Sequence, residues 1–285
     1  MQGIGPPLVT PFDEHGDVDY DRLTDLVGRL EREGVDFLVP CGSTSEAPLL
    51  TPEERTRVIE TTAEVASVPV LAGTGAPGLR QTRAWTEAAA EAGAVGALVV
   101  TPFYYNHSQD DLAGYYRDLA DGASIPIYLY SVPVFAKTRL DPETAGSLAE
   151  HPNIVGMKDS AGDLGAFVRT LDRVEESFDL LVGDASVLAQ ALDAGASGGI
   201  AALANLYPDR LSALVETHSD DPEFARERNR SLVSINRAVT TEHGIPGLKY
   251  AMRQRGFPAG YARRPHTEPS ESARADITDR MEQLP

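Results

Sequence analysis

Short apolar runs recur along this chain at intervals of roughly 25 to 35 residues, and helical patterns fill the intervals. Each run is too short for a helix and is bounded by turn residues, which indicates a buried strand. Strands that alternate with helices pair in parallel, with the helices as crossover connections. The eight runs are residues 7–9, 37–39, 68–72, 97–100, 125–130, 154–157, 180–182 and 199–203.

The number of runs indicates the architecture. Eight strand–helix units fit a closed (β/α)8 TIM barrel better than an open doubly wound sheet, and the glycine fingerprint of a dinucleotide fold is absent. Residues 20–33 are a typical interval, with apolar side chains at helical spacing. Thr51 and Pro52 begin another helix, as its N-cap and first residue. We therefore predict an α/β fold with the barrel over residues 1–208.

The last part of the chain has a different pattern, because no strong strand follows residue 208. Residues 221–241, 244–255 and 272–283 are expected to be helices, and no low-complexity linker precedes them. We predict that residues 209–285 form a C-terminal helical extension packed on the barrel.

The composition is acidic and poor in lysine. Acidic residues outnumber basic ones 43 to 25, the net charge is −18, and only Lys137, Lys158 and Lys249 are lysines. Such surfaces suit a salt-saturated cytoplasm, so we expect a halophilic protein. The same charge makes nucleic acid and anionic membrane surfaces poor partners. Where lysine is scarce, each remaining lysine is a candidate for a specific role.

The sequence lacks a membrane span, a leader segment and a metal-binding pattern, and these features bear on the expected cellular location and metal content. No apolar run approaches the ~18 residues of a membrane span, and no basic and apolar leader precedes residues 7–9, so we expect a cytoplasmic protein. One cysteine, Cys41, excludes an internal disulfide, and we expect it to be a small buried side chain. The six histidines are scattered, so we expect no metal.

Lys158 stands at the end of an apolar strand, residues 154–157. Burying an ammonium group is costly, so a lysine here forms an ion pair, extends to solvent or acts as a nucleophile. In a barrel the reactive groups lie at the C-terminal ends of strands. Other strand ends carry Tyr104 and Tyr105, Tyr128 and Tyr130, and a hydroxyl-rich turn at residues 41–46. Packing and capping explain some of these residues equally well.

Together these groups form a consistent chemical set. A lysine amine in an apolar site attacks a ketone and forms a Schiff base, so no cofactor is needed beyond that covalent imine. A nearby phenol transfers the proton that dehydration and carbon–carbon cleavage require. Hydroxyls and backbone N–H groups can hold an adjacent carboxylate.

Three segments carry a family resemblance that extends over nearly the whole chain. They are residues 42–46 (Gly-Ser-Thr-Ser-Glu), 130–133 (Tyr-Ser-Val-Pro) and 156–159 (Gly-Met-Lys-Asp). The chain resembles the class I pyruvate-dependent aldolase superfamily, which includes dihydrodipicolinate synthase, N-acetylneuraminate lyase and archaeal 2-keto-3-deoxygluconate aldolase. Residues 102–106, 182–184 and 198–205 also match its pattern.

The resemblance implies roles for individual residues. Lys158 would form an imine with pyruvate or another 2-keto acid, and Tyr130 would relay the proton. Tyr105 would reach into a neighbouring subunit's site, within a homotetramer built as a dimer of dimers. Ser43 and Thr44 would bind the substrate carboxylate, and the Ile200 carbonyl would face the lysine. The implied catalytic residues are therefore Lys158, Tyr130, Thr44 and Tyr105. The implied substrate-binding residues are Ser43, Thr44, Gly183 and Ile200.

Two departures from the family pattern refine the expected function. Ser45 stands where the family usually has glycine, and we expect activity to survive this change. Phe135 stands where dihydrodipicolinate synthases have an arginine that binds the second substrate's carboxylate, and an aromatic ring cannot replace a bidentate guanidinium. Lys137 or Arg139 would have to compensate for the missing arginine. The same two residues are the candidates to hold the phosphate of a phosphorylated substrate.

Cleavage of a sugar acid is therefore the leading expectation. The expected enzyme is a carbon–carbon lyase of carbohydrate metabolism that converts 2-keto-3-deoxygluconate, or its 6-phosphate, to pyruvate and glyceraldehyde or glyceraldehyde 3-phosphate. The alternatives are dihydrodipicolinate synthase, another 2-keto acid lyase or dehydratase, and a catalytically silent binding barrel. The presence of Lys158, Tyr130 and Thr44 together argues against the silent barrel.

Overall fold

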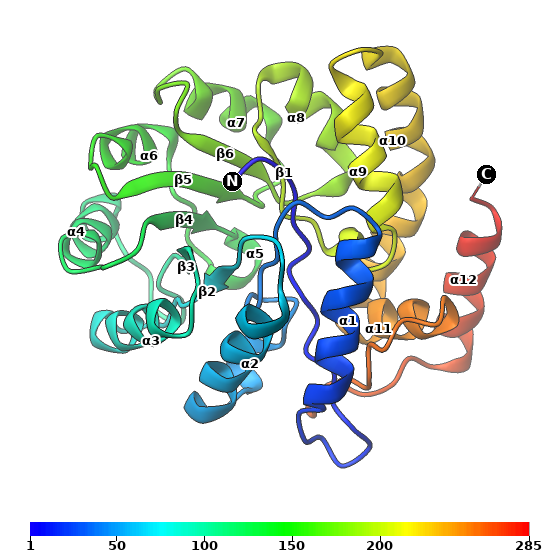
Figure 1. The fold of residues 1–285 in the computed structure, drawn as a ribbon. Helices are drawn as coiled ribbons and strands as arrows, with labels where there is room; N and C mark the ends of the chain where they lie inside the picture. Colours follow the sequence, from blue (N-terminus) through cyan, green and yellow to red (C-terminus); the bar gives the residue numbers. More distant parts are fainter. Residues whose placement is uncertain (285) are drawn as a thin grey trace.

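A computed structural model describes residues 1–284 and contains one curled parallel sheet surrounded by helices (Figure 1). The strands pair in the order β1-β7-β6-β5-β4-β3-β2. Their bounds are β1 Gly3–Ile4, β2 Leu71–Gly73, β3 Gly96–Val100, β4 Ile127–Ser131, β5 Ile154–Asp159, β6 Asp179–Val182 and β7 Gly198–Gly199. The predicted (β/α)8 barrel with C-terminal helices is confirmed.

Residues 37–39 close the barrel without forming a regular strand. Pro7 pairs with Val39 and Leu38 pairs with Val70, both in parallel. The Leu38 carbonyl accepts from Leu71 N at 2.9 Å, and the Val39 carbonyl accepts from Leu8 N at 2.9 Å. This segment therefore fills the gap between β1 and β2, at the place where the sequence predicted a strand.

Two predicted strand positions were wrong. The first strand is Gly3–Ile4 rather than residues 7–9, because Pro6 and Pro7 have no N–H to continue the ladder. The last is Gly198–Gly199, and η3 (Ala202–Asn205) begins within the remaining predicted run. Gly198 has φ of +146°, and a Cβ there would lie 1.9 Å from the Gly3 carbonyl oxygen, so the close approach of β7 to β1 requires glycine.

Helices cover the outside of the sheet, with α3, α4, α6, α7 and α8 following one another around it in Figure 1. The α-helices are α1 (Tyr20–Arg32), α2 (Pro52–Val65), α3 (Leu79–Glu91), α4 (Gln109–Ala120), α5 (Pro133–Ala136), α6 (Pro142–Ala149), α7 (Leu164–Leu171), α8 (Leu188–Ala194), α9 (Pro208–His218), α10 (Pro222–Arg237), α11 (Gly244–Gln254) and α12 (Glu271–Glu282). The other helical turns are the 3-10 helices η1 (Ala47–Leu49), η2 (Ala185–Val187) and η3, and the π-helix η4 (Ala238–Glu242).

Local sequence signals account for several of these helices. In α1 the four apolar residues at helical spacing are all fully buried against the barrel. Helix α2 begins as predicted, with the Thr51 side chain accepting from Glu54 N and the Glu54 carboxylate accepting from Thr51 N. No helix within residues 1–284 is both long enough and apolar enough to cross a membrane.

The C-terminal helices pack on one side of the barrel. Helix α9 contacts β1, and α10 packs on α8, α9 and η2. Asn229 of α10 joins these elements, since its amide accepts from Ala189 N at 2.8 Å and donates to the Ala185 carbonyl at 2.6 Å. Helices α11 and α12 continue this layer, shown in orange and red in Figure 1.

Candidate active site

Lys158 and Tyr130 are neighbours at the C-terminal end of the sheet. Tyr130 on β4 pairs directly with Lys158 on β5 in the parallel register. The Lys158 Nζ atom lies 4.3 Å from the centroid of the Tyr130 ring, and each residue is 5% exposed. Among the described residues Lys158 forms no ion pair, which removes one of the three explanations for its position. Its amine is thus available to a ligand's carbonyl group.

The second tyrosine of β4 has a different environment. The Tyr128 hydroxyl donates to Asp179 Oδ2 at 2.7 Å and accepts from the Met1 amino group at 2.9 Å. Burial and the Asp179 carboxylate raise the pKa of Tyr128. Tyr128 and Tyr130 both point into the barrel, as their period-2 spacing predicted, but only Tyr130 lies beside Lys158.

Residues 41–46, which we call the Ser43 loop, follow the segment that closes the barrel. Its left-handed residues are Cys41 (φ 60°) and Glu46 (φ 57°). Ser45 is fully buried: its Oγ accepts from Gly42 N at 3.0 Å and donates to the Leu8 carbonyl at 2.5 Å. Because Ser45 does not adopt the left-handed conformation, a side chain at this position is accommodated.

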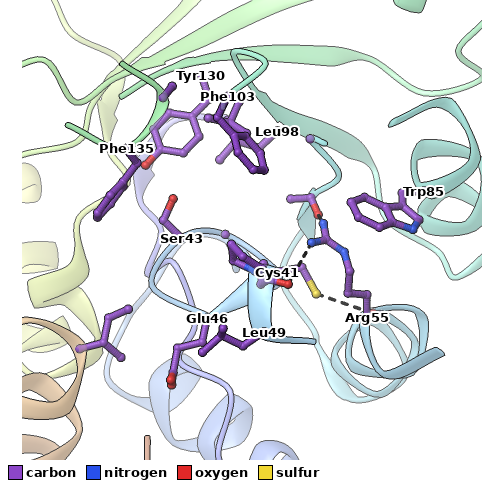
Figure 2. Close-up of a pocket in the computed structure, with 18 of the residues that line it drawn as sticks. Cys41, Ser43, Glu46, Leu49, Arg55, Trp85, Leu98, Phe103, Tyr130 and Phe135 are labelled. Atoms are coloured by element: carbon purple, nitrogen blue, oxygen red, sulfur yellow. Dashed lines mark hydrogen bonds between the residues drawn. The ribbon is translucent and has the colours of Figure 1, made fainter. Parts of the chain in front are cut away.

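The two hydroxyls expected to hold a carboxylate lie between these anchored residues. Ser43 and Thr44 are half-buried, and neither side chain hydrogen-bonds to another protein group within residues 1–284. In Figure 2 the Ser43 hydroxyl points toward the side of the pocket where Tyr130 and Phe135 lie. Both hydroxyls are therefore available to a ligand.

A cavity of about 360 Å³ adjoins Tyr130 (Figure 2). Ser43 and Tyr130 contribute hydroxyls, whereas much of the wall is apolar. Lys158 does not line this cavity, but it lies against the Tyr130 ring. The apolar lining includes Leu49, Leu98, Val100, Phe103, Phe135 and Ile245.

Arg55 is the guanidinium in the cavity wall. It is 5% exposed, lies 3.9 Å above the Trp85 ring, and donates to the carbonyls of Gly73 at 2.8 Å and Ala47 at 3.3 Å. Burial lowers the pKa of Arg55. Figure 2 shows Arg55 and Trp85 on the side of the pocket away from Phe135. Arg55 is thus already bonded to the protein backbone.

The two cations that the sequence predicted, Lys137 and Arg139, lie outside the cavity. The Lys137 amine donates to the Val134 carbonyl at 3.1 Å in an exposed position, and Arg139 pairs with Asp163 at 2.9 Å. Phe135 does line the cavity, at the position where the family comparison expected an arginine. Neither Lys137 nor Arg139 supplies a cation to the cavity in place of that arginine.

The remaining predicted residues are distributed differently. The Gly183 N–H donates to the Asp159 carbonyl at 2.7 Å, and a Cβ on Gly183 would lie 1.8 Å from Ser160 Oγ. Ile200 is fully buried in the same interior cluster as Tyr130. Tyr105 is 67% exposed and does not line the cavity, and its ring packs edge-on against Tyr104 at 5.0 Å. Within a single chain Tyr105 therefore lies at the surface, outside the cavity.

Sequence reasoning missed the contribution of the C-terminal extension. Ile245 and His266 line the cavity, although they are about 200 residues from the Ser43 loop. The His266 Nδ1 atom lies 2.8 Å from Glu46 Oε2. No local pattern marks such residues, because their role depends on contacts across the fold.

Cys41 is a buried free cysteine whose thiol has low reactivity. Its Sγ lies 3.6 Å from the Arg55 carbonyl oxygen, and burial raises the pKa of its thiol to about 11. The expectation that Cys41 is a buried side chain is confirmed.

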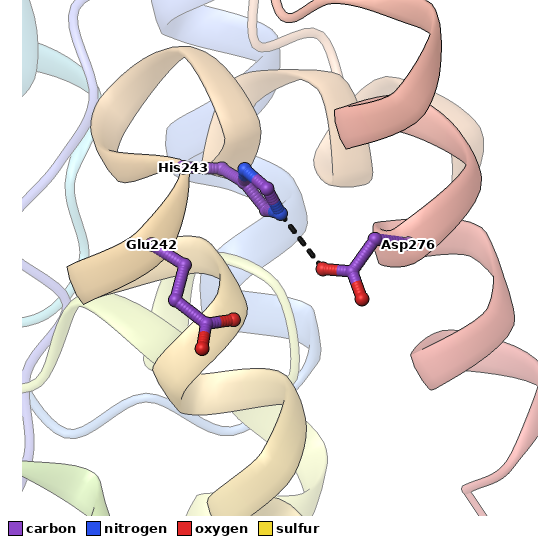
Figure 3. Close-up of side chains that lie close together, drawn as sticks. All are labelled: Glu242, His243 and Asp276. Atoms are coloured by element: carbon purple, nitrogen blue, oxygen red, sulfur yellow. Dashed lines mark hydrogen bonds and ion pairs between the residues drawn. The ribbon is translucent and has the colours of Figure 1, made fainter.

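One cluster away from the cavity contains side chains of the kinds that bind metals, namely Glu242, His243 and Asp276 (Figure 3). The His243 Nε2 atom lies 2.7 Å from Asp276 Oδ2. Arg280 approaches Glu242 at 2.7 Å and Asp276 at 3.0 Å, so a guanidinium already compensates both carboxylates. These contacts join η4 to α12 and account for the cluster structurally.

Comparison with known proteins places this site in a family. The model of the Dihydrodipicolinate synthetase family matches residues 1–284. An uncharacterized DapA-like lyase from Halobacterium salinarum is 37% identical, with 93% of this chain and 88% of that protein covered. A 4-hydroxy-tetrahydrodipicolinate synthase from Haloarcula marismortui is 35% identical, with 95% of this chain and 90% of that protein covered.

Solved structures agree with the sequence comparisons. Dihydrodipicolinate synthase DapA-2 from Bacillus anthracis superposes with a TM-score of 0.96 at 27% identity, covering 100% of this chain and 98% of that one. YagE, a prophage protein from E. coli K12 solved in complex with pyruvate, has a TM-score of 0.95 at 28% identity, with the same coverage. This chain therefore belongs to the dihydrodipicolinate synthetase family and is a pyruvate-dependent carbon–carbon lyase of the class I aldolase superfamily.

Proposed function

We propose that Lys158 is the nucleophile and that the substrate is a 2-keto-3-deoxy sugar acid. The observation that carries this proposal is the placement of Lys158, which is buried against the Tyr130 ring without an acidic partner among residues 1–284. An amine in such a place attacks a ketone carbon, and loss of water from the carbinolamine leaves an imine.

Cleavage then follows from the electron demand of the imine. Tyr130 accepts the proton of the C4 hydroxyl, the C3–C4 bond breaks, and its electron pair moves into an enamine on Lys158. Protonation of the enamine and hydrolysis of the imine release pyruvate and regenerate the amine. Ser43 and Thr44 hold the carboxylate next to the reacting carbon throughout.

The aldehyde half is glyceraldehyde, from 2-keto-3-deoxygluconate, or glyceraldehyde 3-phosphate, from its 6-phosphate. Phe135 in the cavity wall supports an aldehyde without a carboxylate, because an aromatic ring offers no bidentate donor. The unphosphorylated acid is favoured further because Lys137 and Arg139 lie outside the cavity and Arg55 is bonded to two carbonyls. Carbohydrate metabolism is the matching context.

A second candidate is 4-hydroxy-tetrahydrodipicolinate synthase, which several relatives are named. It shares the pyruvate imine but joins pyruvate to an aldehyde that carries a carboxylate. Phe135→Arg tests the distinction: if the proposal holds, the wild type cleaves 2-keto-3-deoxygluconate, and the variant loses cleavage while gaining condensation with aspartate semialdehyde. Efficient condensation by the wild type would favour the second candidate instead.

Borohydride trapping tests the nucleophile directly. Pyruvate plus borohydride should add one covalent group to the wild type, detected by mass spectrometry, and Lys158→Ala should not be labelled. Lys137→Ala is the matched control, since Lys137 is exposed and outside the cavity, and it should label normally. Labelling that persists in Lys158→Ala would overturn the assignment.

We also propose a homotetramer, a dimer of dimers, in which Tyr105 completes a neighbouring site. Tyr104 and Tyr105 are 84% and 67% exposed, an unusual state for two adjacent aromatic rings. Light scattering of the purified protein in molar KCl, and again in dilute buffer, tests both the assembly and the expected need for salt. A fully active monomer would remove Tyr105 from the proposed mechanism.

A further inference from the structure

The Ser43 loop has a backbone that its own sequence does not favour. Cys41 and Glu46, at its two ends, are non-glycine residues in the left-handed region. That conformation is costly for residues with a side chain and persists only where surrounding contacts impose it. Contacts that impose it also determine where Ser43 and Thr44 lie.

The carboxylate of Glu46 provides the contacts at one end. Glu46 is 1% exposed, and both of its oxygens are hydrogen-bonded to the C-terminal extension. Oε1 accepts from Lys249 Nζ at 2.6 Å, and Oε2 accepts from Arg263 N at 3.0 Å and lies 2.8 Å from His266 Nδ1. In Figure 2 the Glu46 side chain points away from Ser43, and these hydrogen bonds tie its carboxylate to the extension.

Lys249 joins three parts of the chain at this point. Its Nζ is fully buried and uses all three donors: on Glu46 Oε1, on the Thr10 carbonyl at 2.6 Å and on the Tyr261 carbonyl at 2.7 Å. Thr10 follows β1, and its hydroxyl in turn donates to the Ser45 carbonyl at 2.8 Å. One ammonium group therefore links the β1 side of the barrel, the Ser43 loop and residues 261–266, which we call the C-terminal strap.

The C-terminal strap is itself held against the loop. Arg263 donates to the Leu49 carbonyl at 2.8 Å and forms a bidentate pair with Glu54, both contacts at 2.6 Å. Its guanidinium also lies 4.3 Å from the centroid of the Phe12 ring. The strap is thus fixed to the turn and to the helix that directly follow the Ser43 loop.

We propose that Lys249, Glu46 and His266 are positioning residues for the substrate carboxylate. Lys249 and His266 hold Glu46 in its left-handed conformation, and Glu46 in turn places the Ser43 and Thr44 hydroxyls where the carboxylate of the imine-forming acid binds. Ser45 holds the other side of the loop through Gly42 and Leu8. This inference rests on the proposed imine at Lys158, and it assigns to the C-terminal extension a part in substrate binding.

The test is the pyruvate concentration that gives half-maximal borohydride trapping of Lys158. Lys249→Met removes the ammonium group that binds Glu46, so this concentration should rise about 10- to 100-fold. Trapping at saturating pyruvate should stay complete. Asn229→Ala is the matched control, because Asn229 is equally buried and joins the extension to η2 and α8 rather than to the loop. It should lower thermal stability without changing the half-maximal concentration.

A second variant covers the case in which Lys249→Met does not fold. The double variant Lys249→Met with Glu46→Gln removes both charges and leaves no buried unpaired carboxylate. It should fold and still show the raised half-maximal concentration. An unchanged concentration in either folded variant would overturn the positioning role, whereas absence of trapping in the wild type would overturn the proposed imine instead.

Discussion

Ser45→Ala offers a quantitative test of how the Ser43 loop is held. In the native structure the Ser45 hydroxyl is the partner of the Gly42 N–H and of the Leu8 carbonyl. Leu8 is 1% exposed, so its carbonyl would be left without a partner and without water, whereas half-buried Gly42 can recover part of the loss. At about 1–3 kcal/mol for each unsatisfied buried group, we expect a loss of about 2–4 kcal/mol.

Calorimetry and urea titration measure this loss. For a chain of this size each kcal/mol lowers the melting temperature by about 2 °C, so the expected fall is about 4–8 °C. Ser43→Ala is the matched control in the same loop, since its half-buried hydroxyl has no hydrogen-bond partner within residues 1–284.

The two serines should therefore separate stability from binding. Ser43→Ala should change the free energy of unfolding by less than about 0.5 kcal/mol. It should nevertheless weaken pyruvate binding about tenfold, through the loss of one charge-assisted hydrogen bond. Equal stability losses in the two variants, or a loss below about 0.5 kcal/mol in Ser45→Ala, would refute this account of the loop.

Three further predictions follow from the same geometry. Tyr130→Phe should keep the fold and lose about 10²-fold in turnover, measured as pyruvate release, and an unchanged rate would exclude Tyr130 as the proton relay. Cys41, with its thiol pKa raised to about 11, should have roughly one thiolate in a thousand at pH 8, so iodoacetamide should label it in urea and scarcely at all in the folded protein. Burial raises the pKa of Asp159 above its ordinary value of 3.8, so its protonated form stabilises the fold at low pH, and that contribution is lost as pH rises through the folded pKa. Asp159→Asn should therefore raise the melting temperature more at pH 7 than at pH 4, and an equal difference at both values would contradict this assignment.

Much of the fold could be predicted from the sequence because its signals are local. The spacing of apolar runs indicated the barrel, and the caps of α1 and α2 lie within a few residues of the helices they begin. The errors occurred where a local rule was overlooked or absent. Pro6 and Pro7 could have moved the first strand toward residue 3, whereas nothing in residues 37–39 indicates that they pair only through isolated bridges.

The candidate site was predictable only for residues at strand ends. Lys158 and Tyr130 were identifiable because each stands at the end of an apolar strand, and the register of β4 and β5 in the structure then makes them neighbours. Ser45 was recognised as unusual, but its bond to Leu8 spans 37 residues and has no local signature. Lys249 is one of only three lysines in the sequence, and this scarcity is the one sequence feature that points to its role. Its partner Glu46 lies 203 residues earlier, and only the folded chain brings the two together.

The separation between Glu46 and His266 has a consequence during synthesis. The two residues are 220 positions apart, so at about 5–20 residues per second the loop emerges roughly 10 to 40 seconds before the strap that holds it. During that interval a ribosome-bound chain can already contain Lys158 and Tyr130 on adjacent strands, while Ser43 and Thr44 still lack their final support. Nascent chains halted before residue 249 should therefore bind pyruvate poorly, even where the strands of the barrel have formed.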